Sequence, residues 1–428
     1  MRTLYFVANR NRDDAKIIAY LRIFGAVCVE GPKWCGKTWA CRRQAQSEFL
    51  VGDPEGNFQN RRLVQLDISS AFEGETPHLI DEWQEFPELW DATRAYVDVS
   101  PEKGKFLMTG SSTPNRKGVM HSGTGRIASI RMLPMTLWES GLSDGTVSLK
   151  ELCNNTPLSV VRTRNPNLHE IAEWIVRGGW PGALDLSASD AVHIPREYIA
   201  QLEENDIHRI DNTRRDIHKV DLLLKSLARN ESTTASIATL CSDISGTDGG
   251  AVDSDTVSAY LNALQRLFVV ENRKPFHANI RSSVRVKQAE KRHFCDPSLA
   301  CAILRLSPER LIGDLNFMGF LFEALAERDL RVYADSFGAQ LMHYPDYSNR
   351  ELDAVMEMEN GDWAAVEIKL GAAQEDAAAA NLLAIRDAIA REPKGRPPKS
   401  LIVVLGRSAA AYTRPDGVHV VPISALRP

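Results

Sequence analysis

The sequence is 428 residues long, which corresponds to about three domains at the usual size of ~150 residues each. Apolar residues make up 43% and charged residues 25%, as in ordinary globular proteins, and 51 basic against 56 acidic residues give a net charge of −5. This balance excludes a histone-like polycation but leaves room for a local basic patch. The sequence has no apolar run near the ~20 residues of a membrane helix, and its polar N-terminus lacks the apolar core of a signal peptide. We therefore expect a cytoplasmic protein with no membrane partner.

The first part of the chain, residues 1–140, alternates helix and strand patterns. Apolar residues at helical spacing from Ile17 to Phe24 predict a helix that Gly25 ends, and Ala26–Glu30 is typical of a short buried strand. A glycine-rich turn and a helix from Thr38 follow. The other predicted elements are strands over 63–68, 78–81 and 105–109 and a helix over 87–97. Strands that alternate with helices predict an α/β domain with a parallel sheet covered on both faces.

The middle part, residues 141–291, has mostly helical patterns. Near its end, a helix over 234–244 precedes a polar glycine-rich turn over 245–255. An apolar stripe from Val257 to Leu267 then predicts a second helix, and the chain becomes strand-like over 267–271. Helix, turn, helix and strand in this order predict a winged helix-turn-helix.

The last part, residues 292–428, again mixes helices and strands. A helix over 318–331 precedes a hairpin whose strands cover 350–358 and 363–370 around Asn360-Gly361. An alanine-rich helix over 374–390 and apolar strands over 401–405 and 418–421 complete a predicted α/β domain.

A phosphate-binding motif of the form GxxxxGK[ST] lies between the first predicted strand and the next helix. It comprises Gly31, Pro32, Lys33, Trp34, Cys35, Gly36, Lys37 and Thr38. In such a loop the backbone N–H groups and the helix N-terminus hold the phosphates. Lys37 would contact the β and γ phosphates of ATP, and the Thr38 hydroxyl would bind Mg²⁺. The alternative is a fortuitous glycine turn, which the strand-to-helix context disfavours.

An acidic pair, Asp81 and Glu82, ends the strand predicted over 78–81. Asp81 would hold the water shell of Mg²⁺, and Glu82 would polarise the attacking water as the catalytic base. Thr109 and Ser111 lie at the end of the next strand, where either hydroxyl could contact the γ phosphate, although a plain Ser/Thr turn is the alternative. Together with the phosphate-binding loop these residues predict a Mg²⁺-dependent ATPase core.

The motifs together resemble the bacterial and archaeal AAA-type ATPases that carry a C-terminal DUF4143 domain. This resemblance implies a P-loop ATPase, then a winged helix, then a restriction-endonuclease-like fold. The bulky pair Trp34-Cys35 inside the loop departs from the small residues of many P-loop ATPases. The resemblance rests on 30–38, 79–84, 107–112, 121–127, 178–182, 291–297 and 321–323, and so covers nearly the whole chain.

Arg126, in the Gly-Thr-Gly-Arg stretch 123–126, is the candidate arginine finger, and Arg94 and Arg131 are weaker candidates. A guanidinium can neutralise charge on the transferring phosphoryl group, and a neighbouring subunit can supply it. This interpretation implies a homo-oligomer, whereas the alternative is an ordinary surface or structural arginine.

A basic stretch follows the predicted winged helix. Residues 271–292 contain seven basic and two acidic residues, a net charge of +5 in 22 residues. Clustered cations beside a winged helix are typical of proteins that bind the phosphate backbone of DNA. The alternative is a solvated loop whose charge acidic neighbours balance in space. The basic residues are Arg273, Lys274, Arg281, Arg285, Lys287, Lys291 and Arg292.

Asp353, Glu367 and Lys369 fit the D-x(n)-E-x-K pattern of metal-dependent nucleases, with Glu323 on the preceding helix. In such a site the carboxylates bind Mg²⁺ and the lysine stabilises the attacking hydroxide. The face of the hairpin on which each of these side chains lies depends on the length of the turn. A two-residue loop, Asn360-Gly361, pairs residue 353 with 368 and separates the carboxylates, whereas a three-residue loop over 360–362 pairs 353 with 369 and places all three side chains on one face.

Three functions remain open from the sequence. The first is an ATP-hydrolysing enzyme whose nucleotide cycle regulates a DNA-associated, nuclease-like domain. The second is a nucleotide-dependent regulatory or protein-binding module whose nuclease-like fold is inactive. The third is a signalling NTPase that acts on protein partners, which is favoured if acidic residues neutralise the basic stretch in space.

Overall fold

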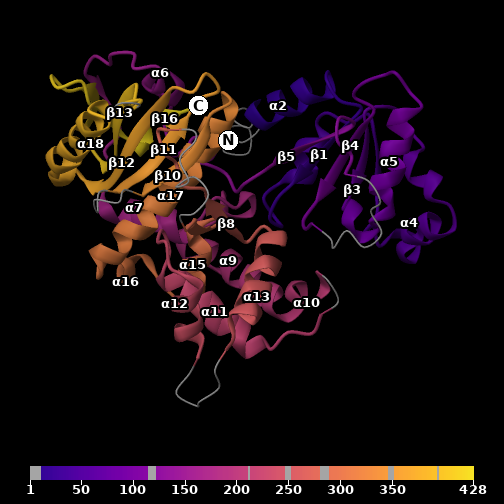
Figure 1. The fold of residues 1–428 in the computed structure, drawn as a ribbon. Coiled ribbons are helices and arrows are strands. Elements are labelled where there is room, and N and C mark those ends of the chain that lie inside the picture. The colour runs from indigo at the N-terminus through magenta and orange to yellow at the C-terminus, as the bar shows by residue number, and fades with distance from the viewer. Residues whose placement is uncertain are drawn as a thin grey trace. The chain divides into compact units, whose positions relative to one another are not determined.

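The computed structural model describes residues 11–113, 122–210, 213–245, 252–279, 289–345, 351–392 and 395–428. The chain forms two compact units and passes between them several times (Figure 1). The first unit contains Met1–Pro134, Gln201–Asp216 and Tyr260–Val269, and the second contains Met135–Ala200, Ile217–Ala259 and Val270–Pro428. This partition differs from the predicted consecutive domains because residues 141–291 contribute to both units.

The first unit is built on a parallel sheet of five strands in the order β2-β3-β4-β1-β5. The strands β1, β3 and β4 agree with the predicted strands to within one residue. The central position of β4, between β1 and β3, brings together the ends of three strands that carry predicted site residues. The bounds are β1 (Ala26–Glu30), β2 (Ser47–Leu50), β3 (His78–Asp81), β4 (Phe106–Gly110) and β5 (Ile127–Arg131).

Helices cover both faces of this sheet, as predicted, because the buried strands are apolar on both sides. On one face Val27 and Val29 of β1 pack with residues of α2 (Asn11–Leu21) and α3 (Lys37–Arg42). On the other face Ala26 and Cys28 share a core with α4 (Glu55–Leu66) and α5 (Glu88–Asp98). Two 3₁₀ turns, η1 (Ile68–Phe72) and η2 (Trp83–Glu85), complete this part of the chain.

The strand predicted over 63–68 is wrong, because these residues end α4 and begin η1. Only Val64 of this apolar run is well buried, whereas the side chain of Leu66 is 85% exposed. The edge strand is instead β2, whose four residues are only half-buried or exposed and so lack a clear apolar pattern.

The second unit contains a mixed sheet of seven strands in the order β10-β11-β12-β13-β15-β14-β7. Strands β10, β11 and β12 are antiparallel neighbours, and β13 and β15 continue the sheet in parallel with β12. The predicted hairpin and both apolar strands are confirmed. The bounds are β7 (Val161–Arg162), β10 (Gln340–Pro345), β11 (Glu351–Glu357), β12 (Trp363–Gly371), β13 (Ser400–Arg407), β14 (Ala410–Thr413) and β15 (His419–Pro422).

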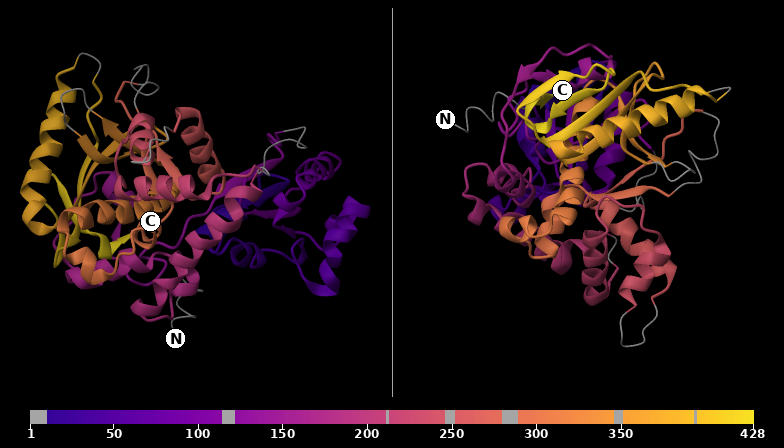
Figure 2. Two further views of the ribbon diagram at one scale, coloured as in Figure 1. Left: turned by 90° about the horizontal axis from the view of Figure 1, so that it is seen from below. Right: turned by 90° about the vertical axis from the view of Figure 1, so that its left-hand side faces the viewer.

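The alanine-rich helix α18 (Glu375–Ala390) lies along this sheet (Figure 2). Its buried side chains Leu382 and Ile385 share a core with Ala365 of β12 and Val403 of β13. Helix α17 (Leu315–Ser336) also contacts β12 but contributes no residue to that core. Other elements are α6 (Leu149–Cys153), α7 (Leu168–Arg177), η3 (Pro181–Ala183), α8 (Ala188–Ala191), α9 (His193–Gln201), α15 (Pro297–Ile303), α16 (Pro308–Ile312), η5 (Ala372–Gln374), η6 (Ile423–Ala425) and the paired β6 (Val147–Ser148) and β16 (Leu426–Arg427).

The region predicted as a winged helix contains three helices followed by a two-stranded antiparallel sheet. The helices are α11 (Ile217–Arg229), α12 (Ile237–Ile244) and α13 (Ser254–Arg266), and the strands are β8 (Val270–Arg273) and β9 (Lys291–Phe294). This order agrees with the predicted elements, while α13 ends in the first unit rather than the second. The winged helix as a DNA-binding fold therefore stays a prediction.

A buried ionic network explains two of the sequence motifs in the second unit. The Arg328 guanidinium, on α17, lies 2.7 Å from carboxylate oxygens of both Asp296 and Asp329. Asp296 accepts a hydrogen bond from the Gly179 N–H at 2.9 Å, and Asp329 accepts one from the Leu137 N–H at 2.8 Å. The network thus fixes the Gly178–Gly182 motif and the start of the second unit to α17.

We expect Arg328→Met to lower the free energy of unfolding by roughly 3–5 kcal/mol, because two buried carboxylates would lose their cation. Chemical denaturation of the full chain measures this change. The matched Arg310→Met variant alters an exposed arginine and should stay within about 0.5 kcal/mol of the parent. A loss below about 1 kcal/mol for Arg328→Met would show that the network does not stabilise the fold.

Within the residues that the structure describes, no helix is both long enough and apolar enough to cross a membrane.

Candidate functional site

The glycine-rich loop joins β1 to α3 at the C-terminal edge of the parallel sheet. A Cβ on Gly31 would come within 2.1 Å of the Met132 carbonyl oxygen, and Gly36 has a φ of 96°. Both positions therefore need glycine, one for space and one for backbone conformation. Lys37 is 5% exposed, and its ammonium donates a hydrogen bond to the Pro32 carbonyl oxygen at 2.8 Å. The cation predicted to contact phosphates thus lies inside the loop.

Thr38, Asp81 and Thr109 converge at this edge from three different elements. The Thr38 hydroxyl donates to Asp81 Oδ1 at 2.7 Å, and the Thr109 hydroxyl donates to the same oxygen at 2.6 Å. Hydroxyl and carboxylate oxygens are ligands that Mg²⁺ prefers. Thr38 and Asp81 therefore fit a magnesium ion beside the phosphate-binding loop.

Glu82 follows β3 with a φ of 59°, a left-handed conformation that is uncommon for residues other than glycine and is concentrated at functional sites. Its carboxylate accepts a hydrogen bond from the Ser111 hydroxyl at 2.8 Å and another from the Gln84 amide. Its N–H donates to the Thr109 hydroxyl at 3.0 Å. The sequence analysis assigned no role to Gln84, although its position two residues after Glu82 could have indicated one.

The hairpin of the second unit places Asp353, Glu367 and Lys369 together. The pairing of Ala354 with Val366 continues to place Asp353 opposite Glu367, so the three side chains share one face. This confirms the shared face of the three-residue-loop alternative, but the loop is Glu359–Gly361, one residue earlier than predicted. The shared face is also that of Ala365 and α18, and Asn381 of α18 donates to Glu367 at 2.7 Å.

The Lys369 ammonium lies 2.8 Å from Asp353 Oδ2 and 2.6 Å from Glu367 Oε2. Two carboxylates that share one cation fit a single Mg²⁺, which is commonly bound by one or two carboxylates with water in its other positions. Burial, and then the Asp353 charge, raise the pKa of Glu367 to about 7. Burial alone would lower the pKa of Lys369, but the two carboxylates outweigh it and raise this pKa.

Three regions of the chain match known protein families. Residues 24–140 match an AAA domain, residues 168–310 match a domain of unknown function (DUF8612), and residues 318–426 match another (DUF4143). The chain combines an AAA domain with a C-terminal DUF4143 domain. The family implied by the sequence motifs is therefore confirmed, and the AAA domain contains the whole phosphate-binding loop.

No protein with curated annotation matches the chain. Among solved structures, a Walker-type ATPase of Pyrococcus abyssi is 14% identical with a TM-score of 0.43, over 69% of this chain and 95% of that one. A signal transduction ATPase with numerous domains and a tetratricopeptide repeat sensor, from Pyrococcus horikoshii, is 11% identical with a TM-score of 0.21. That match covers 74% of this chain and 47% of the other, so this chain spans about half of its length.

Two loops of the AAA domain contact segments that come from much later in the sequence but belong to the same unit. Lys33 of the phosphate-binding loop forms an ion pair with Asp206 at 2.6 Å. Beyond β4, the Thr113 carbonyl oxygen accepts a hydrogen bond from the Arg266 guanidinium at 2.9 Å. Asp206 and Arg266 carry no local motif, so sequence analysis missed both.

Arg126 lies at the edge of the AAA sheet opposite to the phosphate-binding loop. It precedes β5, whose first residue, Ile127, pairs with Ala26 at the start of β1. The loop follows the other end of β1, roughly 16 Å away at ~3.3 Å per residue. Arg126 pairs with Asp98 at 2.7 Å. It therefore cannot serve the nucleotide of its own chain, and a role as an arginine finger requires a second copy.

The weaker candidates divide between the two edges. Arg94 also pairs with Asp98, at 2.6 Å, near the end of α5. Arg131, at the end of β5, lies opposite Glu30 in the strand register at the C-terminal end of β1, and its guanidinium lies 3.6 Å from the centre of the Phe268 ring. Arg131 is thus the arginine of the three that lies at the phosphate-binding edge.

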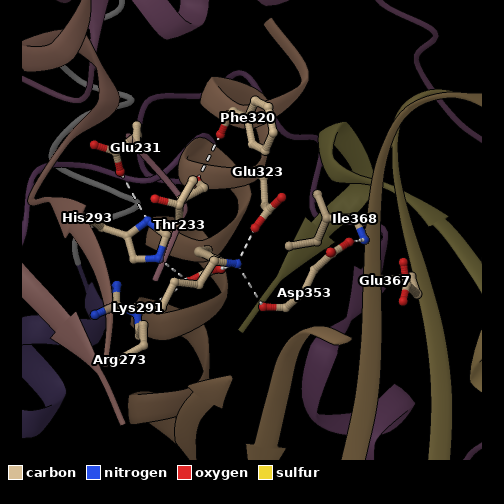
Figure 3. Close-up of polar contacts among 12 residues, drawn as sticks. Glu231, Thr233, Arg273, Lys291, His293, Phe320, Glu323, Asp353, Glu367 and Ile368 are labelled. Carbon is tan, nitrogen blue, oxygen red and sulfur yellow. Dashed lines mark hydrogen bonds and ion pairs between the residues drawn. The ribbon is translucent and has the colours of Figure 1, made fainter. Parts of the chain in front are cut away.

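Glu323 does not join Asp353 and Glu367, which corrects the predicted set of three metal-binding carboxylates. Within the described parts of the chain, no group of three or more His, Cys, Asp or Glu side chains is placed to hold a metal ion. The Glu323 carboxylate, on α17, instead contacts the ammonium of Lys291 on β9 (Figure 3). Burial raises the pKa of Glu323 to about 8, although Lys291 opposes this shift.

The predicted basic surface is wrong for Arg273 and Lys291, which are 5% and 2% exposed. Arg273 lies 3.5 Å from Glu327, and Lys291 lies 2.9 Å from the same carboxylate. The Arg292 guanidinium donates to the Ala235 carbonyl oxygen, whereas Lys274 is exposed. Acidic residues of α17 thus neutralise two of the four cations of this stretch that the structure describes. Arg281, Arg285 and Lys287 lie outside the described residues.

Proposed function

We propose that the chain is a Mg²⁺-dependent ATPase whose nucleotide site lies at the C-terminal edge of the AAA sheet. One observation carries this proposal: Thr38 and Thr109, from α3 and β4, both donate to the same oxygen of Asp81 on β3. A serine/threonine after the loop lysine and an aspartate after a nearby strand are the pair that holds Mg²⁺ in P-loop enzymes. The AAA-domain match supports the same chemistry at a coarser level.

Each side chain then has a distinct task. The loop N–H groups and Lys37 bind the phosphates, and a bound Mg²⁺ would neutralise charge on the β and γ phosphates. Glu82 accepts a proton from the attacking water, while Ser111 and Gln84 orient its carboxylate. Thr109 holds Asp81 and the Glu82 N–H in one arrangement. An arginine finger, if Arg126 supplies it, comes from a second copy of the chain.

Lys37→Ala tests nucleotide binding. A hydrogen bond to a charged group contributes about 1.5–3 kcal/mol, so the variant should bind ATP roughly 10- to 150-fold more weakly. Titration with a fluorescent ATP analogue measures this loss, and Lys103→Ala, at an exposed position before β4, is the matched control. Equal affinity of Lys37→Ala and the parent would place the nucleotide elsewhere.

A second function is favoured by the shared face of Asp353, Glu367 and Lys369. We propose that this pair of carboxylates holds one Mg²⁺, and that Lys369 stabilises a hydroxide that attacks a phosphodiester bond. The buried cations near β9 cannot contact a phosphate backbone. The proposal of a nucleic-acid substrate therefore depends on the chemistry of these three groups alone. The nucleotide cycle of the AAA domain would regulate this activity. The alternative is a regulatory or protein-binding module in which the acidic site is inactive.

A further inference from the structure

Lys291 lies in a buried cage of oxygen atoms beside the pair of carboxylates Asp353 and Glu367, which we call the acidic site. Its ammonium contacts a Glu323 carboxylate oxygen and lies 3.4 Å from the Asp353 carbonyl oxygen (Figure 3). It also lies 2.9 Å from Glu327 Oε1. The lysine comes from β9, the two glutamates from α17 and the carbonyl from β11. Only oxygen atoms surround the charge in these contacts, as they would surround a hard metal cation.

The charge balance of the cage depends on this lysine. Glu327 is 1% exposed and also contacts His293 at 3.0 Å and Arg273 at 3.5 Å. Lys291 is the cation that Glu323 and Glu327 share. Without Lys291, the nearly buried Glu323 carboxylate would lie beside the Glu327 carboxylate and near the Asp353 charge. Such an arrangement requires either a proton or another cation.

Asp353 belongs to the acidic site and also contacts the oxygen cage around Lys291. Its side chain binds the Lys369 ammonium at 2.8 Å, while its carbonyl oxygen faces the Lys291 ammonium. Asp353 therefore lies between two ammonium groups. The Lys369 ammonium contacts the carboxylates of Asp353 and Glu367, and the Lys291 ammonium contacts those of Glu323 and Glu327.

We propose that Lys291 is a built-in cation of the acidic site, which occupies the position of a second divalent ion between Glu323 and Glu327. This proposal deepens the proposed second function and rests on it for the first ion, held by Asp353 and Glu367. The site accordingly binds one divalent cation rather than two. It is also composite, because Lys291 lies in the region that matches DUF8612, outside the DUF4143 match.

Electron paramagnetic resonance titration of the nucleotide-free full chain with Mn²⁺ tests the proposal by counting bound ions. The parent is expected to bind one Mn²⁺ that Glu367→Gln removes. Lys291→Ala is expected to gain one further Mn²⁺ per chain, which Glu323→Gln in the same chain removes again. Lys291→Arg keeps the charge and should retain the parental count. Lys274→Ala, at an exposed lysine just after β8, is the matched control and should do the same.

Thermal unfolding gives an independent measurement. Lys291→Ala should melt below the parent without metal, and Mn²⁺ should raise its midpoint more than it raises that of the parent, because the ion replaces the missing charge. If Lys291→Ala does not fold without metal, refolding in Mn²⁺ but not in buffer alone supports the proposal. Failure to refold in Mn²⁺ overturns it.

Two binding results would also overturn the proposal: a parent that binds two Mn²⁺, one of which Glu323→Gln removes, or a folded Lys291→Ala that gains none. A third result would distinguish this proposal from the proposed second function. In it the parent binds no Mn²⁺, whereas Lys291→Ala binds one Mn²⁺ that Glu323→Gln removes. That result contradicts the metal site at Asp353 and Glu367 and supports Lys291 as the built-in cation.

Discussion

Glu82→Gln is expected to slow ATP hydrolysis by roughly 10²- to 10⁴-fold, the usual contribution of a positioned general base. The amide cannot accept the proton of the attacking water, although it has nearly the same size and can still accept a hydrogen bond from Ser111. ATP binding should therefore stay close to that of the parent, because the phosphate contacts come from the loop and Lys37. Steady-state phosphate release and a binding titration separate the two effects.

The matched control is Glu85→Gln, the same chemical change three residues later. The Glu85 side chain forms an ion pair with Arg61 at 2.7 Å. The contact of Glu85 with the acid pair is made by its backbone N–H, which donates to the Glu82 carbonyl oxygen at 3.1 Å and is kept in the variant, so hydrolysis should be unchanged. Ser111→Ala should cause an intermediate loss, since it removes one of the groups that orient Glu82. Normal turnover by Glu82→Gln would show that another residue is the base.

The AAA domain was largely predictable because its signals are local. The buried strand β1, the glycine turn and the following helix form one continuous pattern, and the acid pair ends a strand whose apolar residues are consecutive. Edge strand β2 was missed because none of its four residues is fully buried, so it lacks the apolar run of the inner strands. The contacts of Asp206 and Arg266 were missed for a different reason, since each joins residues more than 150 positions apart.

The basic stretch shows where counting charges along a sequence fails. A net charge of +5 over 271–292 implies a surface that attracts phosphate. In the structure Arg273 and Lys291 turn inward instead, because β8 and β9 lie beside the acidic residues of α17, which come about 30 to 50 positions later. The inward turn of these two cations therefore removes them from any surface that could attract phosphate.

The hairpin was predicted in its extent but not in its register. Asn360-Gly361 marks the turn, yet two loop lengths fit the same residues and place Asp353 on opposite faces. The observed loop, Glu359–Gly361, is stabilised by a hydrogen bond from the Gly361 N–H to the Met358 carbonyl oxygen at 2.9 Å. Gly361 has a φ of 80°, which a residue with a side chain rarely adopts, so glycine fixes this loop.

The chain itself offers a route between the nucleotide site and the second unit. Helix α13 begins in the second unit, ends in the first, and supplies Arg266 to the loop beyond β4. Asp206, which pairs with Lys33, lies in the other segment that returns to the first unit. We therefore expect nucleotide binding to act on both returning segments, which would be the physical basis of the proposed regulation by the ATPase cycle.

Asp353→Ala is expected to abolish Mg²⁺- or Mn²⁺-dependent cleavage of a plasmid while ATP hydrolysis stays largely intact. The variant removes one of two carboxylates at the proposed ion and also one of the two groups that hold Lys369. In the proposed mechanism Asp353 and Glu367 would hold the cation, and without Asp353 the site would lose the ligand needed to supply a hydroxide beside Lys369. Plasmid cleavage and phosphate release, measured on the same preparations, distinguish this site from the nucleotide site.

The control is Asp362→Ala, which changes an aspartate of the same hairpin whose partner is Lys399, at 3.0 Å on the surface. It should cleave like the parent. Cleavage retained by Asp353→Ala would exclude this site as its source. A parent that hydrolyses ATP but shows no cleavage with either ion would instead support a regulatory module. In that case the buried lysines neutralise the carboxylates for stability, and the hairpin serves the packing of α18 rather than catalysis.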